Sequence, residues 1–260
     1  MISMSGPDAL QLNDTPQDIP ACVRGAAGYL RNVIREPRIT CRVCAAPVDG
    51  FDRCWRCSQH LCRIGLADIV APLTYAVSGT LSADLLHRYK DNPVRAIREK
   101  HSVIVKRLLE LGIALHERCI ASAAGLAVSL RLVIPSLTGR PGRHPFADLA
   151  RQIKAASATV ALAPAPDAVC DRAVNDKFAL RPAACLKGRH VLILDDVWTT
   201  GSNAQSAALA VRRAGASAVS VMVIGRWLSP RTGIATNFIA TRLQRDYDPT
   251  ICPVTGGKCP

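Results

Sequence analysis

The chain has 260 residues, of which 49% are hydrophobic, enough for one main domain with a core and a small accessory domain. Its formal net charge of +13 is consistent with a polyanionic partner, such as a nucleic acid, a phosphorylated metabolite or an anionic surface. Aromatic residues make up only 4%, which argues against a large base-stacking platform for single-stranded nucleic acid.

The sequence predicts no membrane insertion. The longest uncharged and mainly apolar stretch, 119–130, has 12 residues, whereas a spanning helix needs about 20. The first 20 residues contain Asp8, Asp14 and Asp18 and no apolar run, so no signal peptide is expected. We therefore expect a cytoplasmic protein, in which the 11 cysteines are reduced thiols or metal ligands rather than disulfides.

The chain divides by composition into four parts. These are an N-terminal tail (1–38) with a short helix near 25–34, a Cys-rich segment (39–66), a main domain (67–230) and a C-terminal extension with a Cys pair (231–260). In the main domain, apolar runs alternate with helical patterns. The expected strands are 69–77, 130–137, 158–162, 191–196 and 218–224, and the expected helices are 81–89, 94–116, 145–156 and 202–213. This alternation predicts an α/β fold with a mostly parallel open sheet flanked by helices.

Two CxxC pairs, Cys41 with Cys44 and Cys54 with Cys57, have nine residues between them. Each pair can turn so that both sulfurs face one point, and four such thiolates make the closed tetrahedral site that holds structural zinc. A segment with few aliphatic residues cannot build its own core, so zinc would supply its folding free energy. Redox-active pairs or incidental thiols are the alternatives, but the spacing favours a zinc-ribbon-like segment.

The other cysteines and the scattered basic residues give weaker predictions. Cys252 and Cys259, in the turn-rich CPVTGGKCP, could form a second metal site with Cys62 or Cys22, form an iron–sulfur site, or remain free. The six histidines show no metal-ligand spacing with one another, so we expect them on the surface or satisfied in the core. Solvated faces are expected for Arg226, Arg231, Arg242 and Arg245.

The string VLILDDVWTTGSN (191–203) carries the most information. Its four apolar residues predict a strand buried on both faces, and Asp195 and Asp196 follow at the carboxyl end, where open α/β sheets bind ligands. The tight loop after them opens a helix, so its free N–H groups and hydroxyls predict a monophosphate site made by Thr199, Thr200, Gly201 and Ser202. Together these features predict a ribose 5-phosphate site.

Two other interpretations of this string are weaker. It could be the acidic strand of a P-loop ATPase, but no GxxxxGK[ST] phosphate loop occurs in the chain. It could be a purely structural strand–turn–helix, but that leaves the two adjacent carboxylates unexplained.

The same string resembles the signature of type I phosphoribosyltransferases. With the cysteine pairs, the chain more narrowly resembles the ComF/GntX-like competence-associated family, which combines a zinc-ribbon-like segment with the phosphoribosyltransferase fold. The resemblance covers about 39–228. Three further stretches support it: LLHRYKDNP (85–93), VIPSLTGRPGRHPFADLARQIKA (133–155) and DRAVNDKFAL (171–180).

The resemblance implies a site for phosphoribosyl pyrophosphate (PRPP) with Mg²⁺. Asp195 and Asp196 would hold the ribose hydroxyls, the loop of Thr199 through Ser202 would hold the 5-phosphate, and Arg140 and Arg143 would bind the pyrophosphate. A mobile segment, 164–188, would close over the site. The activity implied is transfer of the phosphoribosyl group to a nitrogenous acceptor.

Other functions stay open at this point. The family resemblance and the net charge also suit a non-catalytic accessory of DNA uptake that binds single-stranded DNA or a competence helicase. A redox or metal sensor rests only on the cysteine count. The sequence is compatible with a homodimer.

Overall fold

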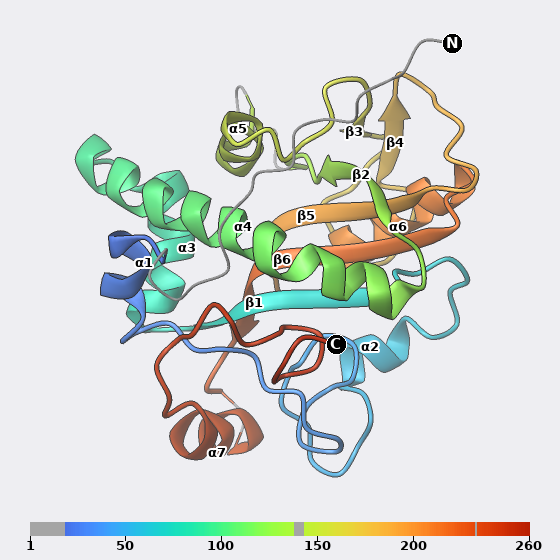
Figure 1. Cartoon of the computed structure of the whole chain (residues 1–260). Helices are drawn as coiled ribbons and strands as arrows, with labels where there is room; N and C mark the ends of the chain where they lie inside the picture. The colour runs from blue at the N-terminus through green and yellow to red at the C-terminus, as the bar shows by residue number, and fades with distance from the viewer. Residues whose placement is uncertain (1–18, 138–142, 232) are drawn as a thin grey trace.

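The computed structural model describes residues 19–137, 143–231 and 233–260. Its centre is a four-stranded parallel sheet in the order β1-β6-β5-β2 (Figure 1). Two further strands pair antiparallel in a separate hairpin, β3-β4. The strands are β1 (Ile69–Val77), β2 (Val128–Val133), β3 (Ala161–Pro164), β4 (Phe178–Arg181), β5 (His190–Trp198) and β6 (Ala218–Leu228). The predicted α/β class with a parallel sheet flanked by helices is therefore confirmed.

The helices differ from the predicted ones mainly in length. Helix α4 continues eight residues beyond its predicted end, because Cys119 and Ile120 extend its buried stripe. The predicted helix near 25–34 is wrong, since the helix there is α1, and the sequence did not predict α2 or α7. The helices of the described residues are α1 (Ala21–Ala26), α2 (Trp55–Gln59), α3 (Leu81–Asp91), α4 (Arg95–Ala124), α5 (Pro145–Gln152), α6 (Ser202–Arg213) and α7 (Gly233–Arg242).

Strand β5 separates two hydrophobic cores. Successive side chains of a strand point to opposite faces of the sheet, so an unbroken apolar run is required when both faces are covered. Leu192 and Leu194 pack with α1, α3, α4 and α5, whereas Val191 and Ile193 pack with α6, the Cys-rich segment and the β3-β4 hairpin. The carboxyl end of β5 therefore emerges between two layers of different composition.

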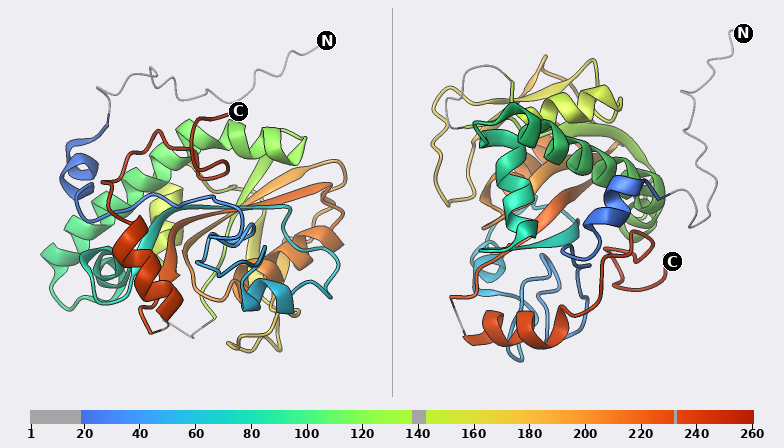
Figure 2. Two further views of the ribbon diagram at one scale, coloured as in Figure 1. Left: turned by 90° about the horizontal axis from the view of Figure 1, so that it is seen from below. Right: turned by 90° about the vertical axis from the view of Figure 1, so that its left-hand side faces the viewer.

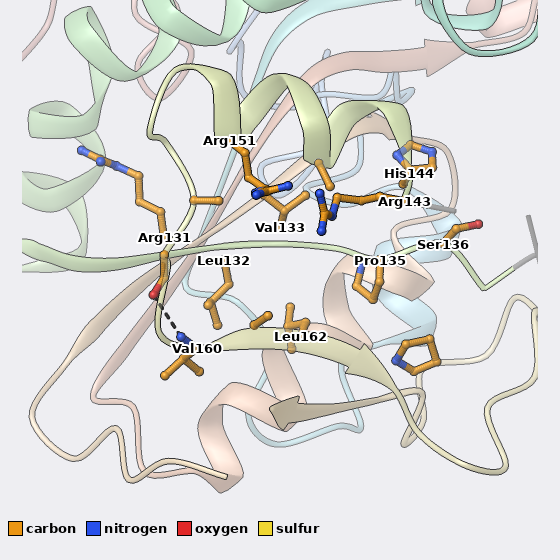
Figure 3. Close-up of a pocket in the computed structure, with 15 residues that line it drawn as sticks. Arg131, Leu132, Val133, Pro135, Ser136, Arg143, His144, Arg151, Val160 and Leu162 are labelled. Atoms are coloured by element: carbon orange, nitrogen blue, oxygen red, sulfur yellow. Dashed lines mark hydrogen bonds between the residues drawn. The ribbon is translucent and has the colours of Figure 1, made fainter. Parts of the chain in front are cut away.

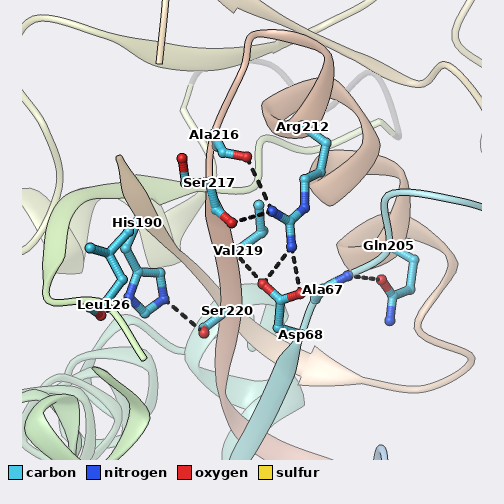
Figure 4. A network of polar contacts seen from close by, with 10 residues as sticks. All are labelled: Ala67, Asp68, Leu126, His190, Gln205, Arg212, Ala216, Ser217, Val219 and Ser220. Atoms are coloured by element: carbon cyan, nitrogen blue, oxygen red, sulfur yellow. Dashed lines mark hydrogen bonds and ion pairs between the residues drawn. The ribbon is translucent and has the colours of Figure 1, made fainter. Parts of the chain in front are cut away.

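A polar network fixes α6 at the amino end of the sheet (Figure 4). Arg212, in the last turn of α6, pairs with Asp68, which also accepts a hydrogen bond from the N–H of Val219 at 2.8 Å. Gln205, nearer the start of α6, accepts one from the N–H of Ala67 at 2.9 Å. With its carboxyl-terminal half tied to β1 and β6, the helix holds its N-terminus at the opposite edge of the sheet.

The two ends of the described chain lie side by side (Figure 2). Arg31 donates to the carbonyl of Leu243 at 2.8 Å, and Asn32 exchanges two hydrogen bonds with the backbone of Asp248, at 2.7 and 2.8 Å. Tyr247 is buried in the core that α4 helps to form. These segments thus pack on the main sheet, while the predicted division into four parts stays a prediction.

Two local differences from the sequence prediction have simple causes. Strand β2 ends at Val133 rather than at residue 137, because Pro135 has no N–H to donate to a ladder. The four-residue strand β4 carries too short a pattern to be recognised. Across the described residues, none of the helices combines the length and the hydropathy that a membrane span requires.

Candidate functional site

The two carboxylates lie at the carboxyl end of β5, as the sequence predicted. Asp196 is buried and shares the face of Leu194, on which α3 packs. There it accepts a hydrogen bond from the hydroxyl of Tyr89 and pairs with Lys90, whose Nζ lies 2.7 Å from Oδ2. The Asp195 carboxylate instead turns back on the chain, where its Oδ1 accepts from the N–H of Asp196 at 2.9 Å.

Burial and charge act differently on these two neighbours. Burial raises the pKa of Asp195 well above its usual value, and repulsion by the Asp196 carboxylate raises it further. Burial also acts to raise the pKa of Asp196, but the positive charge of Lys90 and the hydrogen bonds from Lys90 and Tyr89 outweigh it, so this pKa is lowered. The negative charge of Asp196 is therefore balanced by Lys90, whereas the Asp195 carboxylate would be stabilised by a cation or a proton.

The loop that follows turns tightly at Gly201, which has φ 79° and precedes the first residue of α6. A Cβ at this position would overlap the ring of Trp198, which is buried beneath the loop, so only glycine fits. Within the described part of the chain, the backbone N–H groups of Thr200 and Gly201 donate no hydrogen bond. Free amides at the N-terminus of a 12-residue helix favour an anion.

The predicted covering segment lies over one side of this loop. The Ser202 hydroxyl donates to the carbonyl of Asp171 at 3.3 Å, and the same carbonyl accepts from the fully buried Lys177 at 2.7 Å. Lys177 also donates to Asn203 at 3.2 Å. Ser202 is therefore covered, whereas Thr199 is exposed and Thr200 is partly exposed, so these two residues offer the loop's accessible side. The mobility predicted for 164–188 stays a prediction.

A basic cavity of about 400 Å³ lies beside this site, between β2, α5 and β3 (Figure 3). Arg143, His144 and Arg151 line it, while the guanidinium of Arg131 turns away and pairs with Glu117. Neither acid belongs to the described lining of the cavity. The Nη1 atom of Arg143 lies 3.1 Å from the Oδ1 atom of Asp148. His144 is close enough to contribute to lowering the pKa of Asp196, which joins the cavity electrostatically to the acids.

The structure thus divides the predicted site into two neighbouring parts. The acids and the loop belong to β5 and α6, while Arg143 belongs to the cavity at the end of β2. Arg140, the other predicted pyrophosphate ligand, lies outside the described residues.

The four cysteines of the CxxC pairs come together as predicted. Their sulfurs all lie within 4.8 Å of one another, and the Sγ atoms of Cys44 and Cys54 are 3.7 Å apart. Tetrahedral zinc with bonds of ~2.3 Å would hold two sulfurs about 3.8 Å apart, so the spacing fits a structural metal such as zinc. Tyr75 of β1 fastens the first pair to the sheet by donating to the carbonyl of Ala45 at 2.7 Å.

Arg226 is buried, and the prediction that it lies on a solvated face is wrong. Burial lowers the pKa of its guanidinium, but the neighbouring Cys44 outweighs this effect, so the pKa is raised. Its Nη1 donates to the carbonyls of Trp198 and Thr199, at 3.0 and 3.1 Å. One side chain therefore joins the cysteine cluster to the start of the loop after β5.

Sequence reasoning missed the roles of Tyr89, Lys90 and Arg226. The first two stand in LLHRYKDNP, which resembles a family segment, but nothing in the sequence places that segment against Asp196. For Arg226 a signal existed, because it is the only charged residue in the apolar run of β6.

Comparison with known protein families finds no matching family model, and comparison with curated proteins finds no match.

Proposed function

We propose that the chain is a phosphoribosyltransferase-like protein that binds PRPP, or a related ribose 5-phosphate, with Mg²⁺. One observation carries the proposal: two carboxylates and a turn with free amides follow one another at the carboxyl end of a central parallel strand. Open α/β sheets bind ligands at this edge, and a helix N-terminus is suited to a phosphate.

Each group has a role that matches its chemistry. The N–H groups of Thr200 and Gly201 and the exposed Thr199 hydroxyl would hold the 5-phosphate. Asp195 and Asp196 would accept hydrogen bonds from the ribose hydroxyls. Mg²⁺ takes oxygen ligands and neutralises phosphate charge, and the repulsion that raises the pKa of Asp195 is what a nearby cation would relieve.

Lys90 would change its partner when the ligand binds. Its ammonium now neutralises Asp196, but ribose hydroxyls on that carboxylate would leave the ammonium beside the pyrophosphate of the same ligand. Arg143 and Arg151 of the adjacent cavity, which share the one carboxylate of Asp148, would supply further positive charge for this group. In the transfer reaction, the bond from the anomeric carbon to pyrophosphate breaks and a bond to a nitrogen of the acceptor forms. The protein contributes positioning and anion neutralisation.

Calorimetric titration with PRPP and Mg²⁺ tests the proposal. We expect saturable binding by the parent chain and its loss when Asp195→Asn and Asp196→Asn are combined. Asp246→Asn, which removes an exposed carboxylate on the C-terminal segment, is the matched control and should bind as the parent does. Circular dichroism would confirm that the variants fold. Unaltered affinity in the double variant would refute the assignment.

A second candidate function, binding of single-stranded DNA without catalysis, is favoured by the net charge of +13 and by the arginines around the cavity. Six phosphate contacts on a single strand would give a log–log salt dependence with a slope of about −4. We expect Arg143→Ala combined with Arg151→Ala to reduce that slope. Affinity that does not change with salt would exclude this function.

A further inference from the structure

A second group of residues that could bind a metal ion lies apart from the four-cysteine cluster. His116 and Cys119 on α4 meet Cys252 and Cys259 of the C-terminal segment, and their ligand atoms all lie within 4.8 Å of one another. We propose that these four residues form a second structural zinc site, of the Cys₃His type, which fastens the C-terminal segment to α4.

The spacing of the ligand atoms fits zinc. The Nδ1 atom of His116 and the Sγ atom of Cys259 are 3.6 Å apart. Tetrahedral zinc with a bond of ~2.3 Å to sulfur and ~2.0 Å to nitrogen would hold these two atoms about 3.5 Å apart. The match is as close as the one in the four-cysteine cluster. Three sulfurs and one imidazole form a closed set that leaves no position for substrate, which is typical of a structural ion.

The histidine is oriented for this role. Its Nε2 atom lies 2.7 Å from the carbonyl oxygen of Pro249. A carbonyl can only accept, so Nε2 carries the proton and the lone pair of Nδ1 points toward the three sulfurs. Metal-binding histidines are commonly held by such a hydrogen bond on the far ring nitrogen. His116 is also buried, so this orientation is fixed by packing as well.

Backbone hydrogen bonds shape both segments that carry the ligands. His116 and Cys119 are three residues apart on α4 and so share one face of the helix. In the C-terminal segment, the N–H of Gly256 donates to the carbonyl of Cys252, and the N–H of Cys252 donates to that of Gly257, each at 2.8 Å. These bonds close the loop that presents Cys252 and Cys259 on the same side.

Gly256 is required for this loop. Its φ of 79° is disfavoured for other residues, and a Cβ there would lie 2.8 Å from the Cβ of Arg35. The close approach lets Arg35 donate from Nε to the carbonyl of Pro253 at 2.9 Å.

Arg35 also ties this loop to the first cysteine cluster. Its guanidinium donates to the carbonyl of Val43, between Cys41 and Cys44, at 3.2 Å and to that of Val70 in β1 at 2.6 Å. One side chain thus connects the two groups of cysteine and histidine ligands to each other and to the sheet.

A site made by Cys252 and Cys259 with Cys62 or Cys22 was one of the alternatives that the sequence left open, and the described residues do not form it. Within the described residues, neither Cys62 nor Cys22 belongs to the group, and Cys62 is exposed. The histidine was missed because two of its partners, Cys252 and Cys259, are more than a hundred residues away, although its spacing to Cys119 was a usable signal.

The test is the zinc content of the full chain, purified under reducing conditions and measured by native mass spectrometry. We expect two zinc ions in the parent chain and one when Cys252→Ser and Cys259→Ser are combined. Cys62→Ser combined with Cys170→Ser removes two exposed cysteines and should retain both ions. His116→Cys keeps a ligand in place and should also retain both, which distinguishes coordination from packing.

Two results would overturn the proposal. One is a parent chain with a single zinc ion that Cys44→Ser removes. The other is a disulfide between Cys252 and Cys259 in the reduced-purified protein, detected by peptide mapping. Substitution of the zinc by Co²⁺ gives an independent measurement, because thiolate-to-cobalt absorption should fall by about three sevenths when the three cysteines of this site are replaced.

Discussion

The four-cysteine cluster and the carboxyl end of β5 both concentrate anionic groups, but the protein treats them in opposite ways. At the cluster, four sulfurs converge on one point, and the guanidinium of Arg226 interacts with one of them, that of Cys44. At β5, Lys90 and Tyr89 already bind Asp196, while the one hydrogen bond of the Asp195 carboxylate to a described residue comes from the N–H of its neighbour.

The first arrangement fits a closed structural metal site, whereas the second fits the ligand site proposed above. Four convergent thiolates repel one another until a metal binds them, so metal binding and folding are coupled. A carboxylate neutralised by a lysine is stable without ligand, and a ligand has only to replace one set of contacts with another. Arg226 connects the two regions through its contacts with Cys44 and the loop after β5.

The largest loss of structure is expected from removing one metal ligand of the four-cysteine cluster. Cys41→Ser should abolish one zinc ion and unfold residues 39–66, because apparent zinc-binding free energies of such sites are about 10 kcal/mol or more. Hydrogen exchange would show lost protection in this segment, with Cys170→Ser as the exposed control. Full protection and full zinc content in Cys41→Ser would contradict a structural metal site at the four-cysteine cluster.

A smaller loss of stability is expected from a substitution at the carboxyl end of β5. Lys90→Ala leaves Asp196 buried without its cation, which should lower the free energy of unfolding by about 3 kcal/mol in urea denaturation at pH 7. Because the lowered pKa of Asp196 stabilises the fold only above the unfolded value of about 4, this penalty should fade as the pH falls below that value. Lys100→Ala, at an exposed position on α4, should change little. A loss that persists unchanged at pH 2 would contradict the ion pair.

The third effect is the smallest and has the opposite sign. The raised pKa of Asp195 means that its stability contribution is present below pH 4 and is lost as the pH rises through the folded-state pKa. Asp195→Asn removes this loss, so the variant should be more stable than the parent at pH 8 and equal to it at pH 3. Each unit of pKa difference corresponds to about 1.4 kcal/mol. Thermal unfolding at both pH values is the measurement, and a destabilised variant at pH 8 would show that Asp195 has a counterion in the folded chain.

The sequence predicted some elements to the residue and others not at all, for physical reasons. The bounds 69–77 and 202–213 were correct because an unbroken apolar run and a helix with charged residues in its last turn are strong local signals. The convergence of the four cysteines followed from their spacing. The contacts of Lys90, Arg226 and His116 did not, because they join segments distant in the chain.

The contacts of Arg35 set an order on the assembly of the chain during translation. One guanidinium serves carbonyls at Val43, Val70 and Pro253, and the last of these lies 218 residues further along. A ribosome adding about 5 to 20 residues per second needs roughly 10 to 40 s to cover that distance. The cysteine segment is therefore among the first parts to emerge, whereas its connection through Arg35 to the C-terminal loop is among the last contacts to form.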